Sequence, residues 1–302
     1  MTVPRKVWIF LAIGLAAASQ SGNIIRLGEA HAVAIAAWRL LIATVLLAPL
    51  AGPRLKELAR LTRTELVLLL LTGVALAAHF VAWIAAVQLT TVANAAVCFA
   101  INPVLTATAA HLVFGEKVDR RLVISIALGL LGVIALGGSD LSLAPEHLAG
   151  DGMALLCSVL FTAYFLLGKR LRRVLSTSVQ VTAVYAVAAV FCFAALLVLD
   201  LPVVGYGQRD WLCFGLMALV PTMIGHTSFA SALKYIPAGR ISVLTLSEPL
   251  AAGLVAYLAW GEEIGWGAAV GYILISSSVL VLFVRMRRAY ADSGSGRSHD
   301  GG

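Results

Sequence analysis

Glu248 is an acidic residue in an unusual setting. It lies about eight residues into an apolar stretch and is the only acid well inside one. A carboxylate in such surroundings costs several kcal/mol unless it is paired or protonated. It can therefore take up a proton or meet a positively charged ligand. The alternative is a structural carboxylate that bonds to helix backbone or to a neighbouring cation.

Arg39 is a cation in the same kind of setting. It lies about nine residues into another apolar stretch, too deep for its head group to reach water easily. The guanidinium needs a partner, and Glu248 and the carbonyls of a broken helix are the candidates. A free guanidinium could instead hold a carboxylate through two parallel hydrogen bonds. Structural anchoring and ligand binding both remain open.

Two histidines and two aromatic residues extend this set. His79 and Trp83 are one helical turn apart, and His226 and Phe229 lie close to the positions 146 residues further on. A histidine can donate to a ligand or titrate between about pH 5 and 8, but it can equally join two helices. Aromatic rings suit a flat side chain or an ammonium group, although plain packing would use them as well.

Polar residues also recur at helical spacing, and we expect two such stripes to form facing walls of one cavity. Residues three or four positions apart share one face of a helix. The first stripe is Asn94, Cys98 and Asn102, and the second is Ser242, Thr245 and Glu248. Near residue 20, a polar cluster around Gly22 predicts a gate or a locally unwound segment, with Tyr164 as its approximate counterpart.

The sequence thus predicts a binding site without catalytic residues, metal ligands or a cofactor. The four cysteines fall inside apolar stretches and lack the paired spacing of a metal site. The predicted substrate-binding residues are Gln20, Asn23, Arg39, His79, Trp83, Asn94, Asn102, Tyr164, His226, Phe229, Thr245 and Glu248.

The elements that must position these residues are long and apolar. The chain has 302 residues, of which 61% are hydrophobic and 12% charged, whereas a soluble domain carries roughly 25% charged residues. A membrane-spanning helix needs about 20 apolar residues, so the sequence predicts an all-α integral membrane protein with ten transmembrane helices. The ten stretches are 7–25, 31–50, 65–87, 92–114, 121–138, 150–168, 179–199, 210–233, 240–260 and 266–284.

The basic residues indicate how the chain is oriented in the membrane. With the N-terminus in the cytoplasm, 19 of the 22 Lys and Arg residues fall on the cytoplasmic side, while Arg26 and Arg209 lie opposite and Arg39 lies inside a stretch. Lys and Arg in short loops set orientation. We therefore expect a protein of the inner membrane with both termini cytoplasmic, and we read the net charge of +7 as topological, with no nucleic-acid partner.

The sequence of one predicted helix occurs twice in the chain. Asn102-Pro103 and Gly115-Glu116 return 146 positions later as Glu248-Pro249 and Gly261-Glu262. Basic residues follow the first copy, but none separates the second copy from the next stretch. Each half has five stretches, so the second copy must cross the membrane in the opposite direction. The sequence predicts two inverted five-helix repeats around a central cavity, residues 1–140 and 150–290, with a disordered tail at 291–302.

These features resemble the EamA-type branch of the drug/metabolite transporter superfamily. The resemblance covers nearly the whole chain and rests on the two proline–glycine–glutamate helices, on "AWRLL" around Arg39 and on "YFLLGKR" at 164–170. It implies ten helices in two inverted repeats around a cavity, and members that move small solutes. Many of these members export amino acids or other metabolites, aromatic amino acids among them.

The expected function is therefore export of a small solute by alternating access, which inverted repeats with broken helices favour independently. Efflux of drugs or amines is the alternative within the superfamily, and a receptor or scaffold is the alternative outside it. An enzyme is not expected, because no catalytic constellation or phosphate-binding loop is present. The expected partners are a small molecule and the lipid bilayer, and the small-residue stretches "GLLG" and "SSS" leave a monomer and a homodimer open.

Overall fold

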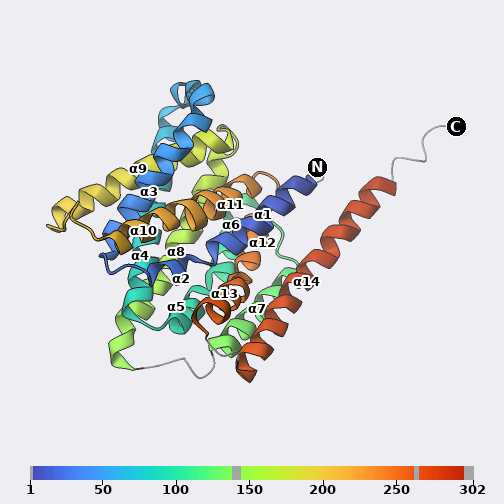
Figure 1. Ribbon diagram of the computed structural model, residues 1–302. Helices are drawn as coiled ribbons and strands as arrows, with labels where there is room; N and C mark the ends of the chain where they lie inside the picture. The colour runs from blue at the N-terminus through green and yellow to red at the C-terminus, as the bar shows by residue number, and fades with distance from the viewer. Residues whose placement is uncertain (1–2, 138–143, 262–264, 296–302) are drawn as a thin grey trace.

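The computed structural model describes residues 3–137, 144–261 and 265–295, and every regular element in these ranges is a helix (Figure 1). Only helices and closed barrels satisfy all backbone groups within a bilayer. Nine of the described helical segments are long and apolar enough to cross a membrane. Residues 240–260, expected to be the remaining one, lie in the two shorter helices Ala238–Thr245 and Glu248–Trp260 and are not among the nine.

The elements divide into those before and those after residues 138–143. The first group is α1 (Arg5–Ala18), α2 (Ser21–Ile25), α3 (Ala32–Ala51), η1 (Gly52–Arg60), α4 (Arg63–Leu89), α5 (Val92–Phe99), α6 (Asn102–Phe114) and α7 (Arg120–Gly137). The second is η3 (Pro145–His147), α8 (Leu148–Leu171), α9 (Thr177–Val198), α10 (Gln208–Met217), η4 (Ala218–His226), α11 (Thr227–Ala232), α12 (Ala238–Thr245), α13 (Glu248–Trp260) and α14 (Trp266–Ser295).

Two of the predicted stretches are broken helices that match each other residue for residue. The pair α5 and α6 and the pair α12 and α13 both have lengths of 8 and 13 residues, and their ends are 146 positions apart. Each second helix has proline in its first turn, where a missing N–H costs nothing. Each ends on a left-handed glycine, Gly115 at φ 66° and Gly261 at φ 68°.

Two further stretches are interrupted in other ways. The first stops at Ala18 and resumes at Ser21, which is where the polar cluster predicted an unwound segment. The eighth passes from α10 through the π-helical segment η4 into α11, with Pro221 inside the π segment. Proline removes one backbone donor, and the wider π turn accommodates the gap.

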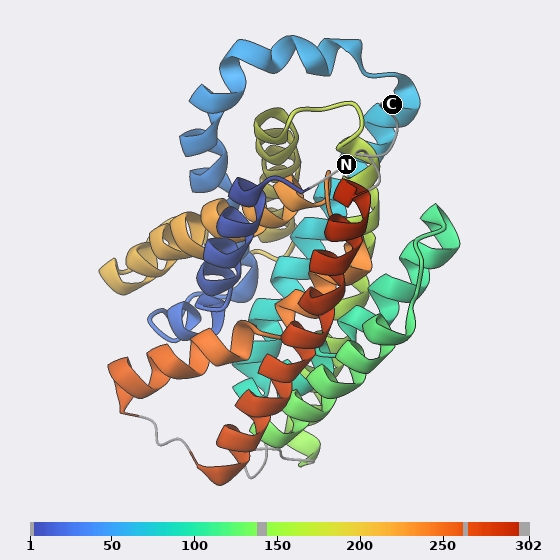
Figure 2. The same ribbon diagram turned by 90° about the vertical axis from the view of Figure 1, so that its right-hand side faces the viewer.

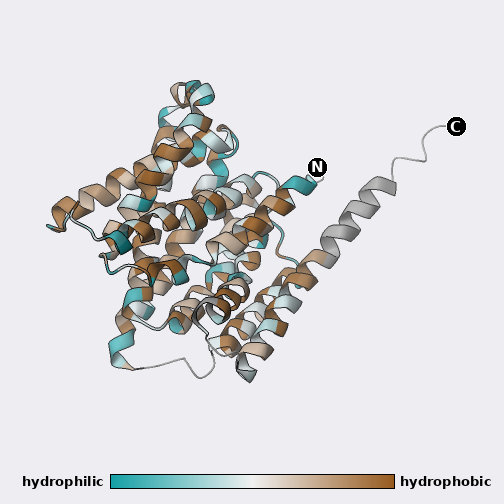
Figure 3. Ribbon diagram, in the orientation of Figure 1, coloured by the Kyte–Doolittle hydropathy of each residue, from teal (hydrophilic) through white to brown (hydrophobic). Residues whose placement is uncertain are grey.

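The outer faces of the bundle are apolar, as contact with lipid requires. Figure 3 shows brown, hydrophobic residues along most of the helices. Leu112 on α6 and Val198 on α9 are 77% and 84% exposed, values that would be unfavourable in water. In lipid, exposing such side chains costs no free energy. Burying them against each other therefore contributes little, and association between the helices depends on close packing.

The helices α7 and α14 form a closely packed pair at one side of the bundle (Figure 2). A Cβ atom on Gly132 would lie 2.7 Å from Ile275 Cγ1, and one on Gly271 would lie 2.7 Å from the Gly132 carbonyl oxygen. The "GLLG" glycines thus serve packing within the chain. α14 continues to Ser295, five residues into the segment expected to be disordered, and residues 296–302 lie outside the described residues.

Gly150 and Gly152 on α8 provide a direct test of this packing. A Cβ on Gly150 would lie 2.7 Å from the Thr90 backbone nitrogen, whereas one on Gly152 meets nothing within 4 Å. We expect Gly150→Ala to destabilise the protein by about 1–3 kcal/mol through overpacking. Gly152→Ala should stabilise it by up to about 1 kcal/mol, since alanine is the better helix former. Thermal unfolding in detergent checks both predictions. Equal changes in the unfolding temperature of the two variants would contradict the packing of α4 on α8.

Candidate functional site

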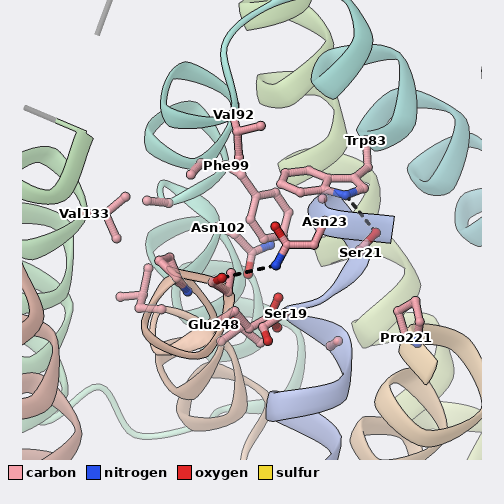
Figure 4. A pocket seen from close by; sticks show the side chains of 18 of the residues that line it. Ser19, Ser21, Asn23, Trp83, Val92, Phe99, Asn102, Val133, Pro221 and Glu248 are labelled. Carbon is pink, nitrogen blue, oxygen red and sulfur yellow. Dashed lines mark hydrogen bonds between the residues drawn. The ribbon is translucent and has the colours of Figure 1, made fainter. Parts of the chain in front are cut away.

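A cavity of about 300 Å³ lies where the broken helices meet. Its walls come from both halves of the chain, and Figure 4 shows Asn23, Trp83, Phe99, Asn102 and Glu248 among the side chains that face it. Nine of the twelve predicted residues line it: Asn23, Arg39, His79, Trp83, Asn102, His226, Phe229, Thr245 and Glu248.

Glu248 has no partner within the described part of the chain. It opens α13, directly before Pro249, and is neither fully buried nor fully exposed. No hydrogen bond or ion pair from a described residue reaches its carboxylate. Glu248 lies at the positive end of the α13 dipole, which favours a negative charge. The carboxylate is therefore available to a proton or to a ligand in the cavity.

Asn102, the equivalent residue of the first broken helix, is fully engaged. Its amide nitrogen donates to the Ser158 carbonyl oxygen at 3.1 Å and to the Thr162 hydroxyl at 3.2 Å, and its amide oxygen accepts from Thr106 at 3.4 Å. The Ser158 hydroxyl donates at 3.0 Å to the Phe99 carbonyl oxygen, which the helix break frees. The side chain thus ties α6 to α8, and the two equivalent positions have different surroundings.

Arg39 has a partner that the sequence did not predict. Its Nε donates to the Thr222 hydroxyl at 2.8 Å, and its guanidinium lies 3.7 Å from the centre of the Phe80 ring. The π segment presents Thr222 to this side chain, and Tyr185 holds the Thr222 carbonyl oxygen at 3.1 Å. Within the described residues no carboxylate pairs with Arg39, Glu248 included. Arg39 is 1% exposed, and its Nη2 has no hydrogen-bond partner there.

The two histidines lie side by side, with ring centres 5.8 Å apart. His79 Nδ1 lies 3.2 Å from the Cys157 carbonyl oxygen and 3.1 Å from the Cys157 Sγ. His79 therefore joins α4 to α8 while also facing the cavity. His226 packs edge-on against Phe80 at 4.7 Å, and its buried Nδ1 has no partner among the described residues.

Aromatic rings form one wall of the cavity. Trp83 and Phe99 meet at 5.6 Å in an edge-to-face arrangement, and Phe99 meets Phe161 at 5.6 Å. The Trp83 indole N–H donates to the Ser21 hydroxyl at 3.1 Å, which orients the ring (Figure 4). Sequence reasoning missed Phe99 and Phe161. The available signal for Phe99 was its spacing: it precedes Asn102, a residue of the expected polar stripe, by three positions and so lies on the same helix face.

Three predicted residues lie outside the cavity lining. The Gln20 amide donates to the Ala251 carbonyl oxygen at 3.3 Å and so joins the α1–α2 turn to α13. Asn94 lies in the first turn of α5, where its amide donates to the Asp151 carboxylate at 3.2 Å. Tyr164 is 4% exposed and stacks on Phe165 behind the cavity wall.

Ionic contacts join helices of the two halves at the opposite end of α7. The cavity reaches Gly137, the last residue of α7, whereas these contacts surround the first residues of that helix. The Glu116 carboxylate pairs with Lys169 and accepts a hydrogen bond from the Ala238 N–H at 3.2 Å. Asp119 pairs with Arg240 at 3.6 Å. Glu262, the equivalent of Glu116, lies outside the described residues.

A bundle of apolar helices around a polar and aromatic cavity, with the helices broken at its walls, has the architecture of a membrane transporter. In the described part of the chain, no group of three or more His, Cys, Asp or Glu residues is placed to hold a metal ion. A family model described as the EamA-like transporter family matches twice, over residues 6–138 and 148–284. The chain belongs to this family, and is a multi-pass membrane transporter of the drug/metabolite superfamily.

Individual relatives agree with this assignment. A curated protein of Archaeoglobus fulgidus, described as an uncharacterized transporter, is 30% identical over 229 residues, which cover 75% of this chain and 78% of the relative. A protein of known crystal structure superposes with a TM-score of 0.81 and covers 95% of this chain and 99% of its own length. It is 19% identical, so this likeness concerns the fold alone.

Proposed function

We propose that the protein exports amino acids or closely related metabolites, aromatic ones among them, by alternating access. The observation that carries the proposal is the pair of incompletely satisfied charges on one cavity. The Glu248 carboxylate has no partner within the described residues, and neither does the Arg39 Nη2 group. A zwitterion could place its amine at Glu248 and its carboxylate at Arg39, with its side chain against Trp83 and Phe99.

We further propose that residues 1–140 and 150–290 are repeats that cross the membrane in opposite directions. The double family match supports this, and so do the broken helices whose ends are 146 positions apart. Alternating access follows if the repeats exchange which end of the cavity is closed. The Glu116–Lys169 and Asp119–Arg240 contacts would then have to separate to open the other end.

The experiment that tests the proposed function is counterflow in proteoliposomes. Vesicles loaded with one unlabelled solute are tested for uptake of the labelled solute, across a panel of amino acids, amines and drugs. We expect zwitterions with large apolar side chains to exchange fastest. Exchange of cations alone would favour efflux of drugs or amines, because a single acid beside aromatic rings also suits that class. Absence of exchange for every solute would contradict the proposal.

The orientation can be tested by reporter fusions. We propose an inner-membrane location with both termini cytoplasmic, since 19 of the 22 basic residues then lie inside. A fusion after Leu50 should report the cytoplasm, and fusions after Asp140 and Gly205 should report the opposite side. The fusion after Asp140 is decisive. A cytoplasmic signal from the segment linking the halves would be incompatible with inverted five-helix repeats.

A further inference from the structure

A second pocket, of about 650 Å³, lies apart from the central cavity and shares none of its lining residues. It is bordered by η1, the end of α8, the α8–α9 connection and the end of α11. Its lining is strongly basic, with four cations and one acid. The residues are Glu57, Lys169, Arg172, Arg173, Val174, Leu175, Ser176, Leu233 and Lys234.

The charges of this basic pocket are only partly compensated. The Glu57 carboxylate accepts a hydrogen bond from the Ser176 N–H at 2.7 Å, and Lys169 already pairs with Glu116. Arg173 and Lys234 are exposed, and no described carboxylate pairs with either of them. A net positive charge therefore faces the pocket.

Arg172 is the buried residue of this group, at 8% exposure. Its Nη1 donates to the Leu175 carbonyl oxygen, while its Nε is buried and has no partner among the described residues. The Ser176 hydroxyl, on the same wall, is also buried without a described partner. Burial lowers the pKa of Arg172, an effect that a bound anion would offset. Two unsatisfied polar groups beside two cations that pair with no described carboxylate suit an acceptor with several oxygens.

We propose that this basic pocket binds a phosphate group, held by Arg172, Arg173, Lys234 and the Ser176 hydroxyl. A phosphate offers several acceptor oxygens and negative charge, which fits the donors better than one carboxylate does. The pocket lining runs from Lys169 across Leu171, the last residue of the α8 span, to Ser176, which places the pocket at the depth of lipid headgroups. The phosphate can come from the headgroup of an anionic phospholipid or from solution. The proposal does not depend on the identity of the exported solute.

The test compares two double variants that remove the same charge from the same end of the molecule. Arg173→Gln with Lys234→Gln removes the exposed cations of the pocket. Lys117→Gln with Arg120→Gln removes one lysine and one arginine that are exposed but lie outside it. The probes are phosphatidylglycerol, phosphatidylcholine and inorganic phosphate, added separately to purified full-length protein in detergent. Binding is measured by native mass spectrometry for the lipids and by thermal shift for phosphate.

We expect the pocket variant to weaken phosphatidylglycerol or phosphate binding roughly tenfold or more, and the control variant to change it less than about twofold. Selective loss of phosphatidylglycerol identifies a lipid headgroup as the source, and loss of the inorganic phosphate response identifies a soluble one. Equal losses in both variants would overturn the proposal, because they would indicate diffuse surface charge. Unchanged binding in the pocket variant would overturn it as well. So would binding of phosphatidylcholine to the unmodified protein as tight as that of phosphatidylglycerol.

Discussion

Glu248→Gln should leave the protein folded and abolish transport driven by a pH gradient, while counterflow at saturating solute persists. Glutamine keeps the size of the side chain but cannot exchange a proton. Folding is unaffected because no described residue loses a partner. A hydrogen bond to a charged group contributes about 1.5–3 kcal/mol, so the apparent affinity for solutes carrying an amine should also fall roughly 10–100-fold.

The measurement is uptake into proteoliposomes with and without an imposed pH gradient. Glu146→Gln is the matched control, since it removes an exposed carboxylate in η3, away from the cavity. Glu248 would be a structural residue if the variant merely expressed less and the surviving protein kept its pH dependence. Loss of counterflow at saturating solute would instead point to damage of the whole cavity.

Trp83→Ala should change which solutes the protein carries. The indole contributes an apolar wall beside Phe99, and its loss costs a bulky ligand roughly 1–3 kcal/mol of burial. Transport of phenylalanine or tryptophan should therefore weaken about tenfold or more, whereas transport of alanine or threonine should change little. Competition by each amino acid against one labelled substrate measures the difference.

Trp8→Ala serves as the control for this variant. Trp8 packs against Phe283 at 5.2 Å and does not line the cavity, so its loss should affect all solutes alike. An equal loss for every solute in Trp83→Ala would mean that the ring only supports the fold. Transport confined to cationic dyes would place the protein with the multidrug members of its superfamily.

The helix breaks could be predicted from the sequence because proline has a local effect. Pro103 and Pro249 each remove a backbone donor. The helix is interrupted immediately before Asn102-Pro103 and again immediately before Glu248-Pro249. The repeat spacing then brought Asn102 and Glu248 to one cavity, as expected. Nine spans are found in the described residues. The pair α12 and α13 is not among them, although α5 and α6, which have the same lengths, together form one.

The partners of individual side chains could not be predicted, because they depend on packing between distant helices. Arg39 binds Thr222, 183 positions away, and that residue lies in the π segment. Asn94 lay on the expected polar stripe, yet Asp151 from α8 holds it at the start of α5. Tyr164 was expected to be the counterpart of the polar cluster near residue 20, but it stacks on the ring of Phe165 and does not line the cavity. Helical spacing predicts on which face of its own helix a residue lies. It does not predict which residue of another helix will contact it.

The difference between Asn102 and Glu248 bears on how the protein divides its population between two conformations. Two identical repeats threaded in opposite directions would make the states open to either side equal in free energy, because a two-fold rotation in the membrane plane would relate them. Hydrogen bonds from Asn102 to α8 break this degeneracy, because the described residues offer Glu248 no equivalent anchor. On the proposed inverted repeats, the two states of the unloaded protein would therefore differ in free energy. In the proposed mechanism, a ligand or proton at Glu248 would supply an anchor there and shift the balance.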